Sequence, residues 1–71
     1  MTLGERLRQL RRVAGMSQHE LHQRAHIPQA MIADVESGGQ PTITLETATQ
    51  LAEALGVSLD VLAGRTWETR E

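Results

Sequence analysis

The spacing of cap and turn residues between Ser17 and Gly38 constrains this chain most, because it leaves room for two short helices. Ser17 is a hydroxyl N-cap with Glu20 three residues later, and this capping box predicts a helix from Gln18. Pro28 suits a first helical position and marks a second start, while Gly38 suits the position just past a helix end. With only two or three residues between them, the two predicted helices of about three turns must cross steeply.

Two patterns flank this pair. Thr2 and Glu5 form another capping box, and an apolar stripe follows it to the predicted helix end near Gly15, made of Leu3, Leu7, Leu10 and Ala14. On the other side, Thr44 caps a fourth helix that ends at Gly56 and carries one apolar side, made of Leu45, Ala48, Leu51, Ala52 and Leu55.

A short fifth helix is predicted between Ser58 and Gly64, with Leu59 and Leu62 on its apolar side. No period-two strand pattern is present in the sequence. We therefore expect an all-α, five-helix bundle in which helices two and three form a helix-turn-helix.

The length of 71 residues predicts one domain, which we place at residues 1–64, with a flexible tail over 65–71 that carries the lone Trp67. The chain has no Cys, no apolar run near the ~20 residues of a membrane span, and no apolar block of a signal peptide at its start. We expect a cytoplasmic protein with no membrane contact. No nucleophile, base and orienting group form a visible set, so neither an enzyme nor a cofactor is expected.

Charge is unevenly distributed along the chain. The formal net charge is −2, but residues 1–26 hold five Arg against two Glu, whereas residues 27–71 hold two Arg against seven acids. The basic part could face a phosphate backbone while the acidic part faces water. Charge alone neither favours nor excludes a nucleic-acid partner.

Four stretches carry a family resemblance: the leucine-rich first helix with Arg11, then GMSQHEL, IADVESG and PTITLETATQLAEALGVSLDVL. Together they span residues 3–63 and resemble the phage Cro/repressor-type helix-turn-helix family, also called the Xre family. The resemblance implies a lambda-repressor-like bundle that binds double-stranded DNA as a homodimer. It also implies that the fifth helix, with Leu59 and Val61, builds the dimer seam.

The resemblance implies which side chains meet DNA. Base contacts fall on the third helix, where Gln29 can pair with adenine and Asp34 can accept from cytosine; the set is Gln29, Ala30, Ala33 and Asp34. Phosphate contacts come from the preceding helices and the following loop, namely Arg12, Ser17, Gln18, Ser37, Gln40 and Thr42. Arg11 and Glu36 match a structural pair that ties the first helix to the end of the third.

Two histidines depart from the family pattern. His22 stands where the family has Ala, so its ring must open the helix crossing or turn outward, and His22→Ala is expected to stabilise the domain. His26 stands at a turn position that favours a left-handed backbone, which His tolerates. With His19 they gather on one side of the second helix, but we expect no metal site, because no Cys or carboxylate completes one.

The sequence therefore predicts a repressor-like transcriptional regulator that places its third helix in the major groove. Two alternatives stay open. The chain could be the antitoxin of a toxin–antitoxin pair that uses the same helices on DNA. The domain could instead dock onto a protein, which the alanines and Asp34 of the third helix would favour.

Overall fold

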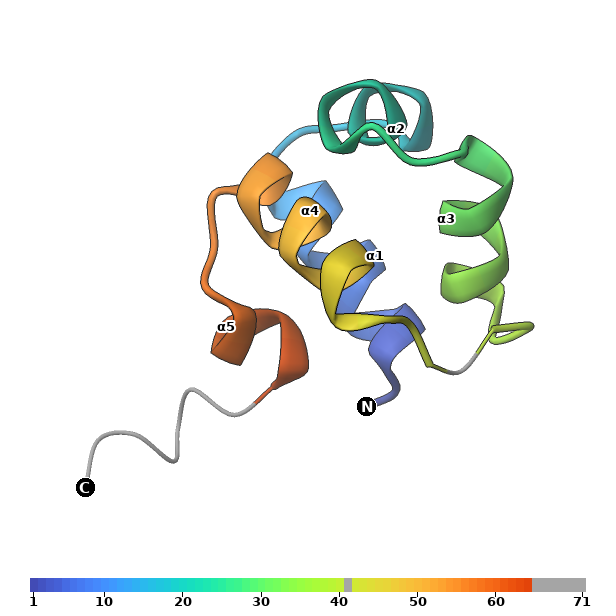
Figure 1. The fold of residues 1–71 in the computed structure, drawn as a ribbon, viewed down its shortest axis with the longest axis vertical. Helices are drawn as coiled ribbons and strands as arrows, with labels where there is room; N and C mark the ends of the chain where they lie inside the picture. The colour runs from blue at the N-terminus through green and yellow to red at the C-terminus, as the bar shows by residue number, and fades with distance from the viewer. Residues whose placement is uncertain (41, 65–71) are drawn as a thin grey trace.

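The computed structural model describes residues 1–40 and 42–64. Five helices make up this part and no strand is present in it: α1 (Leu3–Val13), α2 (Gln18–Ala25), α3 (Gln29–Ser37), α4 (Leu45–Leu55) and α5 (Leu59–Ala63) (Figure 1). The predicted all-α class and the number of helices are confirmed. The predicted tail over 65–71, with Trp67, lies outside the described residues, as does Pro41.

Side-chain caps begin four of the helices. In α1 and α2 the capping boxes are complete, because Thr2 and Ser17 each accept from the backbone N–H three residues on while Glu5 and Glu20 reach back to the cap residue's N–H. Thr44 and Ser58 cap α4 and α5 in the simpler way, through the side-chain oxygen alone. Each cap satisfies a backbone donor that the helix itself cannot pair.

The start of α3 differs from the prediction by one residue. Pro28 is the N-cap, with φ −60° and ψ 140°, so the helix begins at Gln29 and no side chain caps it. The ring of proline fixes φ but leaves ψ free, and the extended ψ keeps Pro28 outside the helix. Both central helices are also shorter than predicted, with 8 residues in α2 and 9 in α3.

The turn between α2 and α3 is made by His26, whose φ of 61° lies in the left-handed region. This is the conformation that the sequence predicted for His26. Its backbone N–H donates to the carbonyl of His22 at 3.0 Å and so closes α2. Ile27 follows with 6% of its surface exposed, which anchors the turn to the core.

The core lies where the helices converge and is built mainly from residues of α1 to α5 at helical spacing: Leu7, Leu21, Ala25, Ile27, Ile32, Val35, Leu51, Ala52, Leu55 and Leu62. Three residues predicted on apolar sides are exceptions, and one of them, Leu59 of α5, is 40% exposed. Ala14 is exposed, because α1 ends one residue earlier. Leu45 is 73% exposed because it is the first residue of α4 and lines an open groove.

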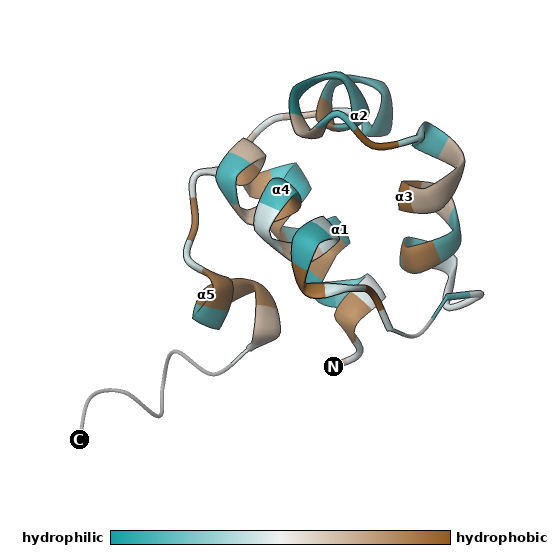
Figure 2. Cartoon of the chain, viewed as in Figure 1, coloured by the Kyte–Doolittle hydropathy of each residue, from teal (hydrophilic) through white to brown (hydrophobic). Residues whose placement is uncertain are grey.

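α3 lies at one edge of the bundle, with its neighbours α1 and α2 to one side (Figure 1). α4 packs against α2 and α5, and α1 also packs against α5. Figure 2 shows hydrophobic colouring mainly on the part of α3 turned toward the other helices and hydrophilic colouring mainly on the outer part. Glu36 is the polar residue of α3 that is buried. The fold therefore leaves one long side of α3 uncovered by the rest of the described chain.

Candidate nucleic-acid interface

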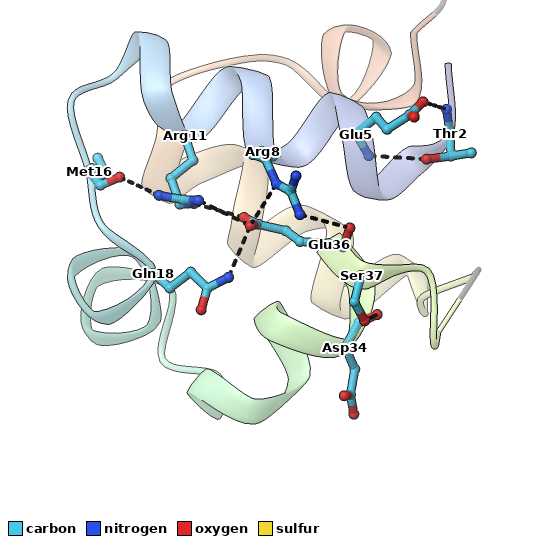
Figure 3. A network of polar contacts seen from close by, with 9 residues as sticks. All are labelled: Thr2, Glu5, Arg8, Arg11, Met16, Gln18, Asp34, Glu36 and Ser37. Carbon is cyan, nitrogen blue, oxygen red and sulfur yellow. Dashed lines mark hydrogen bonds and ion pairs between the residues drawn. The ribbon is translucent and has the colours of Figure 1, made fainter.

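The uncovered side of α3 carries the four residues that the sequence assigned to base contacts. Gln29, Ala30 and Asp34 are exposed and Ala33 is half-buried. The side chain of Asp34 points away from the bundle (Figure 3). These residues are spaced one, three and four apart along a helix, so they share one side of it. We call Gln29, Ala30, Ala33 and Asp34 the outer face of α3.

The opposite side of α3 is fixed in the core. Ile32 and Val35 are buried at 0% and 1% exposure, and Glu36 is buried at 6%. Gly4 of α1 lies so close to this side that a Cβ atom there would overlap the Val35 carbonyl oxygen. α1 and α3 are therefore in backbone contact, and the outer face has a rigid base.

The carboxylate of Glu36 ties three helices together (Figure 3). Arg11 of α1 holds it with two hydrogen bonds, from Nε to Oε2 at 2.8 Å and from Nη2 to Oε1 at 3.1 Å. Gln18 of α2 donates from Nε2 to Oε1 at 3.0 Å. Arg8 forms an ion pair with Oε1 at 3.6 Å and donates to the Glu36 backbone carbonyl at 3.4 Å. Arg11 also donates to the carbonyl of Met16 at 2.9 Å, which fixes the link between α1 and α2.

This set of donors keeps Glu36 charged inside the domain. Burial raises the pKa of Glu36, but the hydrogen bonds from Arg11 and Gln18 and the charges of Arg11 and Arg8 outweigh it, so the pKa lies below its usual value. The same hydrogen bond to Glu36 raises the pKa of Arg11. A buried carboxylate with these partners is an ion pair that braces α3 against α1 and α2.

The two residues assigned to phosphate contacts at the start of α2, Ser17 and Gln18, have partners within the domain. Gln18 is half-buried and gives one of its two amide N–H groups to Glu36. Ser17 is exposed, but its Oγ accepts from the Glu20 backbone N–H at 3.0 Å as the cap of α2. Both residues stand at the N-terminus of α2, where backbone N–H groups favour an anion.

The other assigned phosphate contacts lie after α3 and on α1. Ser37 donates to the Asp34 carbonyl at 3.1 Å, and Gln40 donates from Nε2 to the Thr42 carbonyl at 3.3 Å. Thr42 is exposed at the end of this loop, and Arg12 is exposed near the end of α1. Ser37, Gln40 and Thr42 are thus at or just after the C-terminal end of α3, whereas Ser17 caps α2 and Gln18 is the first residue of α2.

A family comparison agrees with this arrangement. A model of helix-turn-helix proteins matches residues 7–62, which is most of the chain. The chain belongs to the helix-turn-helix family. Within that family it is of the Xre and lambda-repressor-like kind, a class of DNA-binding regulatory domains. No curated protein matches the sequence.

The helix-turn-helix pair of this domain is therefore α2 and α3. In the described residues, no helix combines the length and the apolarity that a membrane crossing requires.

Two of the three histidines of the helix-turn-helix, His19 and His22, make contacts that the sequence did not predict. His22 does not turn outward, because its ring is half-buried and its Nδ1 lies 3.1 Å from the carbonyl oxygen of Ile27. His19 lies against it, with the ring centres 5.1 Å apart. His26 serves the turn through its backbone. Among the described residues, no three His, Cys, Asp or Glu side chains form a group that could hold a metal ion.

Sequence reasoning missed two residues of this region. Arg8 lies three residues before Arg11 and so shares its side of α1, which was a usable signal for a second arginine at Glu36. His19 contacts Gln29 across the turn, with Nδ1 at 3.4 Å from Oε1. No local pattern predicts that contact, because it depends on the angle between α2 and α3.

Proposed function

We propose that this helix-turn-helix domain binds double-stranded DNA sequence-specifically and regulates transcription as a repressor-like protein, with α3 in the major groove. One observation carries the proposal. Three of the four residues of the outer face of α3 are exposed and Ala33 is half-buried, while the opposite side is held by the buried Glu36 and its three donors from α1 and α2. A rigid helix with one free side is what major-groove reading requires.

The chemistry of the outer face suits a limited set of bases. Gln29 can exchange two hydrogen bonds with adenine, through N6 and N7, and the alanine methyl groups can contact a thymine methyl. Asp34 can only accept, for instance from N4 of cytosine. Since no Arg or Lys is present on α3, guanine has no bidentate partner there. We infer that the DNA sequence is rich in A·T pairs where α3 contacts it.

Affinity must come in part from outside α3. Arg8 and Arg11 are engaged with Glu36, and the guanidinium of Arg6 lies against Gly64 at the end of α5. Arg12 is the remaining arginine of α1, and we assign it to a phosphate. With few cations, one domain should bind weakly, and two domains on one duplex bind more strongly. We propose a homodimer that places the two copies of α3 in successive major grooves ~34 Å apart.

The apolar surface available for a seam between two copies lies at α4 and α5. Leu45 is 73% exposed and Leu59 is 40% exposed. Both line a groove of about 360 Å³ whose other walls come from α1, α4, α5 and the loop before α4: Leu3, Thr42, Ile43, Ala48, Leu62 and Ala63. This groove supports the expectation that α5 and its flanks, with Leu59 and Val61, meet the second copy.

Selection from random duplexes, followed by binding measurements over a range of salt concentrations, tests the DNA proposal. We expect one preferred sequence with approximate two-fold symmetry and a logarithmic affinity that falls linearly with the logarithm of salt. The variant Ala30→Glu should abolish binding, because it puts a negative charge on the outer face of α3.

Gln9→Glu is the matched control for Ala30→Glu. It adds the same charge at an exposed position on α1, about 140° around that helix from Gly4 and so away from α3. Equal losses in the two variants would mean that net charge and not the outer face governs binding. Absence of any preferred duplex would contradict the proposal.

A second candidate function is docking of α3 onto an unidentified protein partner. The observation in its favour is that α3 offers Asp34 and two alanines but no basic residue. A protein partner should bind with little dependence on salt, whereas duplex DNA should show a steep dependence. The two candidates are thus separated by the same titration.

A further inference from the structure

The side chain of Gln29 is held by the helix that precedes it. Gln29 is the first residue of α3. Its amide oxygen lies 3.4 Å from Nδ1 of His19 on α2. Both residues are exposed, which places this contact on the surface that the helix-turn-helix would present to DNA.

His19 packs against a second histidine of α2, His22. Its ring lies 5.1 Å from the ring of His22, centre to centre, with the two planes tilted by 57°. His22 is half-buried, and its Nδ1 is 3.1 Å from the carbonyl oxygen of Ile27. A carbonyl oxygen only accepts, so this nitrogen of His22 carries a proton. Ile27 is 6% exposed, and the series of contacts therefore starts in the core and ends at Gln29.

When the proton of His19 is on Nδ1, the contact with His19 selects one of the two orientations of the Gln29 amide. With Oε1 toward His19, Nδ1 of His19 donates and Oε1 accepts. One lone pair of Oε1 and both N–H groups of Nε2 are then left for another partner. Adenine needs one acceptor for its N6 amino group and one donor for N7, so the remaining groups match it. If the amide rotated by half a turn, Nε2 would face a proton on Nδ1 and the contact would be lost.

We propose that His19, supported by His22, is a positioning residue that orients the Gln29 amide for reading adenine. This inference rests on the proposed function, because it assumes that Gln29 meets a base. A side chain already held in its binding orientation loses less freedom on association. His19 thus sharpens the choice of base at the position read by Gln29, while Gln29 makes the contact.

The test compares base discrimination by His19 variants on the selected duplex and on duplexes substituted at one A·T pair. His19→Ala should lower the preference for that pair by about threefold to tenfold, since the orientation but not the reading group is lost. His19→Asn should restore most of the preference, because its side-chain N–H lies near the place of the imidazole Nδ1–H. Gln23→Ala, at an exposed position of the same helix, is the control and should discriminate like the unaltered domain.

A second measurement needs no DNA. In the free domain, NMR relaxation of the Gln29 side-chain amide should show a more mobile group in His19→Ala than in the unaltered domain or in Gln23→Ala. Thermal melting of each variant verifies that the domain is folded. Unchanged Gln29 mobility together with unchanged discrimination in His19→Ala would overturn the inference.

The outcome for Gln29→Ala separates this inference from the proposed function. If Gln29→Ala loses the preference at one pair and His19→Ala keeps it, positioning by His19 is wrong and base reading by Gln29 stands. If Gln29→Ala discriminates like the unaltered domain, Gln29 reads no base and both ideas about it are wrong. If no duplex binds at all, the DNA-binding proposal itself fails.

Discussion

Glu36 is a charged side chain inside a small domain, and its neighbours explain how it remains charged there. Its side chain is 1% exposed, and its nearest cation, Arg11, has a side chain that is 13% exposed. An ion pair in such a place is not in itself stabilising, because the cost of removing two charges from water offsets their attraction. Breaking the pair by removing one partner is costly, however, because the other charge is then buried alone.

The substitution Arg11→Met tests the ion pair between Arg11 and Glu36. Methionine keeps an apolar chain in place of the arginine stem but leaves Glu36 with Gln18 and the more distant Arg8. We expect a loss of about 3 kcal/mol in the free energy of unfolding, a large part of the ~4–10 kcal/mol available to a domain of this length. Urea unfolding measures it. Arg12→Met, at the exposed neighbouring position, should change it by less than ~0.5 kcal/mol.

The dependence of stability on acid follows from the lowered pKa of Glu36. A carboxyl whose pKa is lower in the folded state stabilises the domain above its unfolded pKa of about 4.3. That stabilisation is lost as the pH falls through the lower folded pKa. Urea unfolding from pH 7 to pH 2.5 should therefore show the unaltered domain more stable than Glu36→Gln at neutral pH, with the difference shrinking in acid.

The lowered pKa of Glu5 adds its own acid dependence, but Glu5 is present in both proteins and cancels in the difference. A difference between the two proteins that stays constant down to pH 2.5 would show that Glu36 has the same pKa folded and unfolded.

The sequence predicted which residues belong to this site better than it predicted which of them contact one another. Arg11 and Glu36 were paired from the family resemblance, and the structure places them in contact. Gln18 was assigned to a phosphate, yet one of its donors goes to Glu36. Such a contact joins residues 18 positions apart, and it is fixed only when α2 crosses the end of α3. Spacing within a helix carries no information about that crossing.

The helices of this domain are predictable because their start signals are local. A capping box uses residues three apart, so Thr2 with Glu5 and Ser17 with Glu20 set two helix starts before any tertiary contact forms. Where the signal depended on packing, the prediction was wrong. Leu45 was placed on the buried side of α4 from its period, but it is the first residue of the helix and is exposed.

The contact between α1 and α3 gives a prediction at the scale of elements. Gly4 is inside α1, where alanine would ordinarily be favoured by ~1 kcal/mol. Here the added Cβ would overlap the Val35 carbonyl oxygen and come within 3.1 Å of the Glu36 Cα, and both are backbone atoms that cannot rotate away. Gly4→Ala should therefore lower the free energy of unfolding by about 1–3 kcal/mol in spite of its propensity.

Gly39→Ala is the control for Gly4→Ala. Its Cβ would find its nearest atoms at 3.6 Å, an ordinary contact, and Gly39 does not have a positive φ. Its unfolding free energy should be unchanged or slightly raised. A Gly4→Ala domain as stable as Gly39→Ala would mean that α1 and α3 are not in backbone contact.

A contact of His22 at the turn between α2 and α3 changes the expected effect of His22→Ala on stability. His22→Ala was expected to stabilise the domain, because the family has Ala at this position. The bond from His22 to the Ile27 carbonyl changes the sign, since its loss leaves a carbonyl in a nearly buried residue without that partner. We expect His22→Ala to lose about 1 kcal/mol, a fall of ~4–8 °C in Tm. Gln23→Ala should melt near the unaltered domain, and a higher Tm for His22→Ala would contradict the assignment.

At the scale of the whole molecule, the charges raise the question of how an acidic domain meets DNA. The net charge is −2, and the buried Glu36 engages two of the five arginines that precede Ile27. The electrostatic part of binding should thus be small for one copy. This is why the proposed function includes a dimer, in which two copies double the number of phosphate contacts on one duplex.

The central claim is that the outer face of α3 enters duplex DNA, and mapping of backbone amide shifts by NMR tests it most directly. The ¹⁵N-labelled domain is titrated with the selected duplex. We predict the largest shifts at Gln29, Ala30, Ala33 and Asp34, with smaller ones at the N-terminus of α2 and in the loop after α3. Largest shifts at the groove between α4 and α5, with α3 unaffected, would contradict the account.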